Sequence, residues 1–452
     1  MTLPTFARIA SSLLLLSLIG NISNASADTL LIENVTLING TGRPSVAGAS
    51  VLVDGDRISR IARGSIDPPR GTRRIDGTGK FLMPGLMDMH IHLRGSVELT
   101  PEGLFEVTTD MTRGIRVLHS YIYAGVTSVY DAGNVPDYIM SLRADERSGA
   151  LVSPRIFATG GIVTYPGSHG GNEWGTLVDD WPEAKPALDA HIERQPDVVK
   201  LTYEERGWGA REMIPLLPLD LMQKIIHYYN DRGIRTTVHT SSEYRARQAI
   251  FAGVDTLAHP IIQGPVTQDF ANLMGAKKIP MVTTLTIGEN YSRLAEHPEY
   301  LDQPLYQATV PAEEIEELKS ERRKEYQERK WTWWMQIMTT IAQENLRMIN
   351  EAGGVLVAGT DQSSGPALHR ELELLANAGI PTSEIIRIAT LNGAKFLGKD
   401  RDMGSIEEGK IADMVLLSAD PTMDINNAKQ ILEVIKNGEI VDRSALNLPV
   451  NQ

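Results

Sequence analysis

PGLMDMHIHL, residues 84–93, places two histidines one residue apart at the end of an apolar run. Such a run is typical of a buried strand, in which successive side chains point to opposite faces. His90 and His92 would therefore project from one face of the strand. Two imidazoles side by side at a strand end predict a task that needs two nitrogen donors.

Seven further runs of apolar and β-branched residues follow, with helical stretches between them. They are residues 126–133, 154–161, 197–202, 234–240, 255–260, 279–285 and 354–361. Eight strands that alternate with helices predict the α/β class and, within it, a parallel (β/α)8 TIM barrel. In such a barrel the active site lies at the carboxyl ends of the strands.

The two ends of the chain have a different rhythm, with short strands and turns rich in glycine and aspartate. This pattern covers residues 28–82 and returns in residues 396–452. It indicates antiparallel pairing, and we expect both ends to join in one small β-sandwich. The barrel would then occupy residues 83–395.

The composition limits the classes of partner. The 452 residues are 42% hydrophobic, which is enough for a large core. The formal net charge of -13 argues against nucleic acid or an anionic membrane as the main partner, because phosphates attract a basic surface. We therefore expect a small-molecule substrate. With no cysteine in the chain, any metal must be held by nitrogen and oxygen ligands.

Residues 1–27 have the pattern of a secretory signal peptide. Arg8 precedes a short apolar stretch, and Ala25 and Ala27 flank Ser26 as in a signal-peptidase site. A membrane anchor is the alternative, but the apolar run is short for a bilayer span. We expect cleavage after Ala27, a periplasmic or secreted protein and no membrane contact after cleavage.

One connection, between residues 285 and 354, is far longer than a typical loop of a barrel. Its dense charges of both signs are typical of a solvated helix. Its position, however, is at the active-site end, so residues 286–340 could form a lid or a substrate wall. Trp331 and Trp334 would share a helical face, for which core packing and ligand contact are both open.

The predicted strand ends carry a set of side chains suited to metal chemistry. They are His90, His92, Lys200, His239, His259 and Asp361. Neutral imidazole and carboxylate groups suit zinc and related divalent ions, and the set is large enough for two ions. An ammonium group conflicts with nearby cations. If CO2 carboxylates the amine of Lys200, the resulting anion can bridge both metals.

The ordered motifs PGLMDMHIH, YAGVTSVYDAG, DVVKL, TTVHT, DTLAH and VAGTD resemble those of the amidohydrolase superfamily, and so does the closing LNGAKFLG…GSIEEGKIADMVLL. The resemblance is to its imidazolonepropionase-like and prolidase-like branch. It implies that His90, His92 and Asp361 hold one ion and that His239 and His259 hold the other. Carboxylated Lys200 would be the bridge.

The same resemblance implies a mechanism and further contacts. Asp361 would shuttle the proton while a metal-bridged hydroxide attacks the carbonyl carbon. A glycine-rich loop at residues 159–171 makes His169 a candidate for contacting the substrate. Tyr203 and Arg206 follow Lys200 and could bind polar substrate groups or lie on the surface. Arg94 matches an arginine that grips a carboxylate in dihydroorotase-like members.

The sequence therefore predicts a binuclear, zinc-dependent hydrolase of an amide bond in a dipeptide or an N-acyl amino acid. A cyclic-amide hydrolase or a deaminase is the alternative, and such members generally use one metal and lack the bridging lysine. A ligand-free scaffold protein is the non-enzymatic alternative. The resemblance also implies a possible homo-oligomer.

Overall fold

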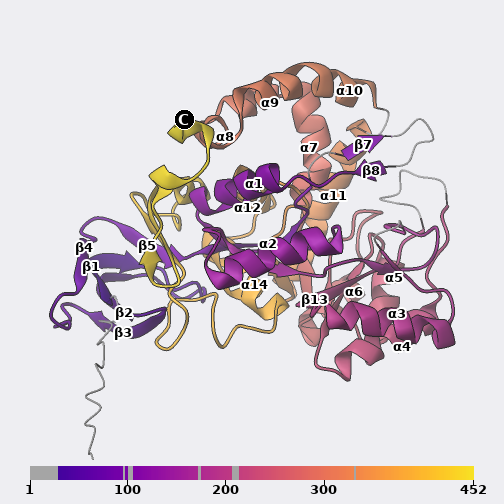
Figure 1. Cartoon of the computed structure of the whole chain (residues 1–452), viewed down its shortest axis with the longest axis horizontal. Coiled ribbons are helices and arrows are strands. Elements are labelled where there is room, and N and C mark those ends of the chain that lie inside the picture. Colours follow the sequence, from indigo (N-terminus) through magenta and orange to yellow (C-terminus); the bar gives the residue numbers. More distant parts are fainter. Residues whose placement is uncertain (1–28, 95–96, 100–104, 172–174, 206–212, 330–331) are drawn as a thin grey trace, which may run out of the picture.

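The computed structural model describes residues 29–94, 97–99, 105–171, 175–205, 213–329 and 332–452. Figure 1 shows the strands of both chain ends on one side of the molecule and an arc of helices, α8 to α10, along another. The predicted signal peptide, residues 1–27, lies outside the described residues.

Each of the eight predicted runs contains a strand, and each of these strands pairs in parallel with its neighbours. The strands are β6 (Leu86–Ile91), β9 (Val126–Asp131), β10 (Arg155–Ala158), β13 (Val198–Thr202), β14 (Arg235–His239), β15 (Thr256–Leu257), β16 (Pro280–Val282) and β17 (Val355–Val357). Most of their residues are buried, as in parallel sheets covered on both faces. The α/β prediction is confirmed.

Two parallel sheets share these strands, and backbone hydrogen bonds link the two sheets. One sheet has the order β10-β9-β6, and the other runs from β13 to β17 beside the short strands β11 (Val163–Thr164) and β12 (Thr176–Leu177). The Met89 amide donates to the Ala358 carbonyl at 2.9 Å, beside β17. The Asp197 amide donates to the Ala158 carbonyl at 2.9 Å, between β10 and β13. The result is a TIM-barrel-like arrangement.

Helices alternate with these strands and begin at recognisable caps. Asp110, Ser242 and Thr267 each accept a backbone N–H of the first turn, which satisfies a donor that the helix leaves open. The helices are α1 (Met111–Tyr123), α2 (Pro136–Ser148), α3 (Trp181–Glu193), α4 (Leu219–Asn230), α5 (Glu243–Phe251), α6 (Gln268–Lys277), α11 (Thr332–Glu351), α12 (Gly365–Asn377), α13 (Thr382–Ile388) and α14 (Leu391–Phe396).

Strands from the two ends of the chain share one sheet. Its members are β1 (Thr29–Leu37), β2 (Val46–Asp54), β3 (Arg57–Arg63), β4 (Arg73–Asp76), β5 (Phe81–Pro84), β18 (Met414–Leu417), β19 (Ile431–Lys436) and β20 (Glu439–Ile440). The junction is the antiparallel pair of β5 and β18, in which Leu82 lies opposite Leu416. A separate apolar cluster, including Val51, Leu82 and Met414, is the core of this unit.

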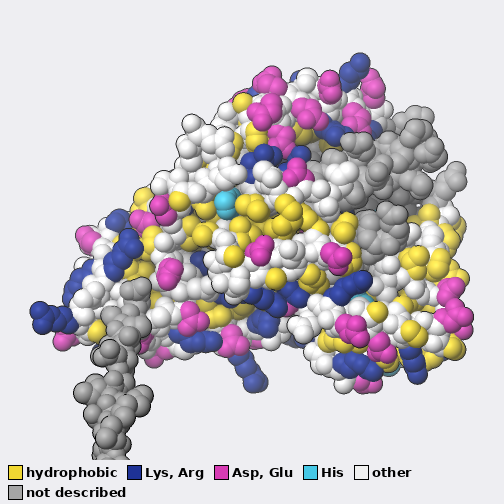
Figure 2. Space-filling view, in the orientation of Figure 1, with side chains coloured by type: hydrophobic (Ala, Val, Ile, Leu, Met, Phe, Trp, Pro, Cys, Tyr) yellow, Lys and Arg dark blue, Asp and Glu magenta, His cyan; other side chains and the backbone are white. Residues whose placement is uncertain are grey.

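Ahead of α11, the long connection forms several short helices rather than one solvated helix. They are α7 (Leu285–Glu296), η1 (Pro298–Asp302), α8 (Pro304–Thr309), α9 (Ala312–Glu317), the π-helix η2 (Leu318–Arg322) and α10 (Arg323–Glu328). Tyr300, Tyr306 and Ile315 give the segment its own apolar cluster. Glu314 accepts Arg113 and Arg116, which ties α9 to α1. Figure 2 shows acidic and basic side chains along this arc.

The tryptophans of this connection have different environments. Trp333 is 57% exposed, whereas Trp334 packs against the main core cluster. Trp331 lies outside the described residues. The remaining elements are β7 (Val97–Leu99), β8 (Phe105–Val107), η3 (Ile425–Lys429), η4 (Arg443–Ala445) and η5 (Pro449–Asn451). In the described part of the chain, no helix combines the length and the apolar character needed to cross a membrane.

Candidate metal centre

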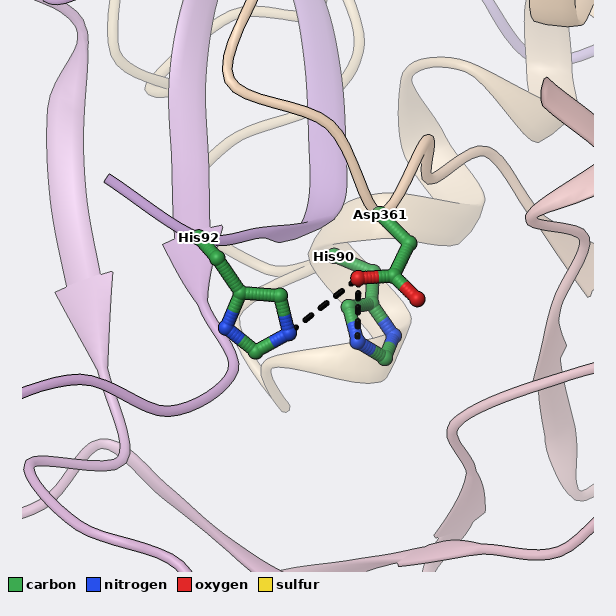
Figure 3. A group of neighbouring side chains, drawn as sticks. All are labelled: His90, His92 and Asp361. Atoms are coloured by element: carbon green, nitrogen blue, oxygen red, sulfur yellow. Dashed lines mark ion pairs between the residues drawn. The ribbon is translucent and has the colours of Figure 1, made fainter. Parts of the chain in front are cut away.

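His90, His92 and Asp361 turn their polar atoms toward one point (Figure 3). One ligand atom from each residue lies within 4.8 Å of the other two. Asp361 Oδ1 is 3.2 Å from His92 Nε2 and 3.8 Å from His90 Nε2. His90 is in β6, His92 follows its last residue, and Asp361 lies four residues past β17.

Backbone carbonyls hold the far nitrogens of both imidazoles. His90 Nδ1 is 2.9 Å from the Ala258 carbonyl oxygen, and His92 Nδ1 is 2.7 Å from that of Gly133. A carbonyl only accepts, so Nδ1 must carry the proton in each contact. Each Nε2 therefore presents a lone pair toward Asp361, which is how outer contacts orient metal-binding histidines.

Three further predicted residues lie beside this group. Lys200, in β13, has its Nζ 3.0 Å from His90 Nε2. The rings of His90 and His259 are 4.4 Å apart, and those of His259 and His239 are 4.3 Å apart. His239 ends β14, and His259 lies two residues past β15, which is shorter than the predicted run. The structure thus brings all six predicted ligands together.

Burial and repulsion from nearby positive charges keep the imidazoles of His90, His92 and His259 neutral. Burial, followed by the charge of Lys200, holds the pKa of His90 well below its usual value. Burial and then His239 do the same to the pKa of His259. Burial and then Arg94 lower the pKa of His92. Neutral imidazole is the form that binds metals.

Lys200 and Asp361 respond to the same surroundings in ways that suit a metal site. Burial lowers the pKa of Lys200 to about 8, although Asp361 opposes the shift. Burial alone would raise the pKa of Asp361, but the positive charges that His90, His92 and Lys200 carry when protonated hold it well below its usual value. The carboxylate is therefore ionised, and the amine has a substantial neutral fraction near pH 8.

A buried carboxylate braces the strained segment that carries Asp361. Asp361 has φ 54°, in the left-handed region that few non-glycine residues adopt. The preceding Thr360 donates its amide and its hydroxyl to the fully buried carboxylate of Asp88, at 3.0 and 2.7 Å. Backbone strain of this kind persists only where neighbours fix it.

The predicted substrate contacts have different fates. The His169 ring stacks on His239 at 4.3 Å. Arg94, three residues past β6, is partly buried, and its charge contributes to lowering the pKa of His92. The Tyr203 hydroxyl donates to Gln248 on α5 at 2.9 Å, and the residue is 1% exposed. Arg206 lies outside the described residues.

Glu204 belongs to the cluster and escaped the sequence analysis. Its Oε2 is 2.9 Å from His239 Nε2, and its Oε1 accepts Gln263 at 3.1 Å. It is 2% exposed. Its position just after β13, four residues beyond Lys200, was the available signal, because strand ends are where barrel enzymes place functional groups.

The long connection comes near the cluster at Tyr291. Tyr291, on α7, has a pKa raised mainly by burial, and its charged neighbours include Asp361 and Arg94. The charges of Asp361 and Arg94 therefore act on a tyrosine of α7. A second tyrosine of the connection, Tyr326 on α10, has its ring 4.9 Å from that of Tyr291.

The donor set fits divalent cations. Four imidazoles and an ionised carboxylate supply the nitrogen and oxygen ligands that zinc prefers, in a buried place where charges need partners. Lys200 fits only as a carbamate, because an ammonium would repel the ions.

Comparisons with known proteins place the chain in a family. The model of the amidohydrolase family matches residues 81–441. The imidazolonepropionase of Shouchella clausii (strain KSM-K16) is 34% identical over 105 residues, which are 22% of this chain and 24% of that protein. The N-acetylglucosamine-6-phosphate deacetylase of Lysinibacillus sphaericus is 37% identical over 71 residues, 16% and 17% of the two chains. The matches thus span about a quarter or less of these relatives.

Solved structures match over nearly the whole chain. A Xaa-Pro dipeptidase with bound methionine has a TM-score of 0.71 and 24% identity, covering 92% of this chain and all of that one. Molinate hydrolase has a TM-score of 0.72 and 19% identity, covering 93% and 96%. At these identities the likeness shows a shared fold.

Proposed function

The chain belongs to the amidohydrolase family, whose members are generally metal-dependent, and on that premise we propose that it hydrolyses a C–N amide bond of a small molecule. The observation that carries the proposal is the group of His90, His92 and Asp361, whose ligand atoms lie within 4.8 Å of one another. Zinc is the metal that these donors suit best. We include in the proposal a closed (β/α)8 barrel flanked by a β-sandwich.

We further propose two ions. His90, His92 and Asp361 would hold one, and His239 and His259 the other. Lys200 would bridge them as a carbamate, formed when its neutral amine adds to CO2 and releases a proton. The contact of Lys200 with His90 and the lowered pKa of about 8 both support this role, because only the neutral amine reacts.

The bound ions would polarise the substrate carbonyl and supply a nucleophile at neutral pH. The chain's own residues do the rest. The carbonyls of Ala258 and Gly133 hold the imidazoles in one tautomer. Asp361, ionised and fixed by its strained backbone, accepts the proton of the attacking water and delivers it to the leaving nitrogen.

For the substrate, we propose a dipeptide or an N-acyl amino acid. The shared fold with a Xaa-Pro dipeptidase supports this class. His169, stacked on His239, and Arg94 are the proposed contacts for its carbonyl and carboxylate groups. Tyr203 is not included, because its hydroxyl is engaged with α5.

Cyclic-amide hydrolysis or deamination is the second candidate, favoured by the identity with imidazolonepropionase. The two candidates differ in metal content. One ion per chain, with turnover of a cyclic amide, would favour the second, whereas two ions with turnover of acyclic amides would favour the first.

The test combines metal analysis with a substrate screen. Purified protein should hold two zinc ions per chain and hydrolyse members of a panel of dipeptides and N-acyl amino acids. Chelation should remove activity, and zinc with bicarbonate should restore it. His297→Gln is a control, because His297 is exposed and lies outside the cluster. A protein that binds no zinc and hydrolyses no amide would instead be a scaffold.

We also propose that the protein is exported and cleaved after Ala27. Mass spectrometry of the protein recovered from the periplasm or the medium should find Asp28 as the first residue. An intact N-terminus in the exported protein would contradict the cleavage.

A further inference from the structure

The segment that follows β16 holds a strained residue. Thr284 has φ 27° and ψ 43°, a backbone conformation that is a genuine outlier for a β-branched side chain. It stands between the end of β16 and the first residue of α7. It is also only 2% exposed. Strain of this kind persists only where the surroundings fix the backbone, and it often marks functional sites.

Glu371, on α12, fixes the backbone on both sides of Thr284. Its Oε1 accepts the Thr283 hydroxyl at 2.5 Å and the Leu285 amide at 3.0 Å. Its Oε2 accepts the amide and the hydroxyl of Thr286, at 2.8 and 2.5 Å. The carboxylate is fully buried, and these four donors satisfy it. Burial raises the pKa of Glu371, and the hydrogen bonds from the four donors oppose that rise.

The strained residue reaches the metal cluster through its hydroxyl. Thr284 Oγ1 is 3.0 Å from His259 Nδ1. When Nδ1 carries the proton, it donates a hydrogen bond to the Thr284 hydroxyl, and His259 presents Nε2 to the cluster. For His90 and His92 a backbone carbonyl has this orienting role. For His259 the orienting group is the Thr284 side chain. The position of that side chain depends on the backbone of the turn, to which Glu371 is hydrogen-bonded.

We propose that Thr284 and Glu371 are positioning residues for His259: Glu371 fixes the turn after β16, and the turn aims the Thr284 hydroxyl at the imidazole. This inference rests on the proposed function, in which His259 holds a metal ion. It goes further by naming the residues on which the affinity of one ion depends. Glu371 acts at a distance, since it touches the turn and not the imidazole.

Two substitutions at residue 284 separate the hydroxyl from the shape of the side chain. Thr284→Val keeps the branched shape and removes the hydrogen bond, whereas Thr284→Ser keeps the hydroxyl. We expect Thr284→Val to weaken one of two zinc-binding steps about 10-fold, as is usual for an outer contact of a metal ligand. Thr284→Ser should stay within about twofold of the parent protein, because the hydroxyl orients the imidazole.

The measurement is a titration of the apoprotein with zinc in competition with a chelator. The absorption spectrum of the cobalt-substituted protein gives a second readout, since it reports ligand geometry. Thr284→Val should change both, and Thr284→Ser should restore both. Thr309→Val is the matched control, because Thr309 is equally buried and its hydroxyl donates to the Leu305 carbonyl within α8.

Glu371→Gln tests the other half of the unit. The side-chain amide of glutamine has only one accepting atom. Two of the four donors of the turn therefore lose their acceptor, and we expect the same zinc-binding step to weaken about 10-fold. The inference is overturned if Thr284→Val keeps both affinities and the cobalt spectrum while the parent protein binds two zinc ions and hydrolyses amides. If the parent protein binds no zinc, the proposed function fails first and the inference fails with it.

Discussion

Buried histidines occur in two regions of this molecule, the strand ends and the helices, and the candidate metal site lies in the first of them. At the strand ends, His90, His92, His239 and His259 are each at most 5% exposed. In the helices, His191 on α3 and His369 on α12 are 0% and 2% exposed. Burial alone therefore does not distinguish a candidate ligand from a structural histidine.

The hydrogen-bond partners of the helical histidines are neutral groups. His191 contacts the Tyr229 hydroxyl through Nδ1 and the Thr159 carbonyl through Nε2, each at 2.8 Å. His369 Nε2 contacts the Ala124 carbonyl at 2.9 Å. These contacts satisfy buried polar atoms and tie elements together, which is the ordinary task of a core histidine.

The strand-end histidines instead have one another as neighbours. Neighbouring rings lie 4.3 to 5.4 Å apart along the series from His92 through His90 and His259 to His239. Packing several groups that can become cations into one buried place destabilises a protein unless an ion or a charge partner compensates. The two groups of histidines thus differ in whether their nitrogen atoms converge, and this convergence identifies the candidate metal site.

The largest effect should come from Asp361→Asn. Asparagine has nearly the same shape and tolerates the left-handed backbone at φ 54°, so the fold should survive. It cannot accept the proton, and we expect kcat to fall about 10²–10⁴-fold, the usual contribution of a general base. Steady-state kinetics on the best amide substrate would measure the loss.

Asp413→Asn is the control from the other region. Asp413 is a buried carboxylate of the terminal sheet unit that accepts the Asn437 amide at 2.8 Å and pairs with Arg155. Its replacement should lower the unfolding midpoint and leave kcat unchanged. Equal losses of kcat in both variants would remove the distinction between the regions and the role of Asp361.

The sequence predicted the strands and the side chains that converge at their ends because both signals are local. Each predicted strand is a short apolar run between turn residues, and each predicted ligand lies in or just after such a run. Convergence follows from the fold, since the carboxyl ends of parallel strands meet at one face. Periodicity could therefore indicate the cluster before any contact was known.

The remaining features of the site depend on contacts between distant segments. Glu371 meets Leu285 across 86 positions of sequence, and no spacing rule links a residue of α12 to a turn after β16. The φ of Thr284 is likewise fixed by tertiary contacts, since local preference disfavours it. The helices of the long connection depend on an apolar cluster of its own, which dense surface charge concealed.

A smaller effect on turnover, but a specific one on metal content, should come from Lys200→Ala. Without the proposed carbamate one ion loses its bridging ligand, and its affinity should fall at least about 100-fold. Metal analysis after gel filtration should then find one zinc ion per chain. Lys410→Ala is the matched control, because Lys410 is also buried but binds the Asp400 carbonyl and the Ser405 hydroxyl.

Retention of two zinc ions by Lys200→Ala would contradict the bridging role. Loss of metal from Lys410→Ala as well would mean that stability, and not ligation, controls metal content. Short carboxylates such as propionate should partly restore activity to Lys200→Ala, because they supply the missing anion.

The helical histidines should affect stability at low pH rather than catalysis. Burial lowers the pKa of His369 to about 4, from 6.5 in the unfolded chain. Between pH 6.5 and about pH 4 the unfolded chain therefore binds a proton at His369 that the folded chain excludes. The contribution of His369 to the free energy of unfolding is highest above pH 6.5 and falls as the pH drops to about 4. At pH 5 the loss amounts to about 2 kcal/mol.

Urea unfolding at pH 7.5 and pH 5.0 would measure this loss. His369→Gln cannot titrate but can still donate to Ala124, so it should lose about 2 kcal/mol less than the parent protein between the two pH values. Zinc content and kcat at pH 7.5 should not change. A parent protein and variant with the same pH dependence would show that His369 is not held neutral.

The smallest effect should come from a histidine that belongs to neither group. His119, on α1, is half-buried and its Nδ1 accepts the Asn447 amide at 2.9 Å, which ties α1 to the end of the chain. His119→Ala removes one such bond, and we expect a loss of about 1 kcal/mol in the free energy of unfolding. Zinc affinity should be unchanged, because His119 is on α1 and has no contact with the cluster. A variant that lost zinc without losing stability would mean that position in the fold does not separate ligands from structural histidines.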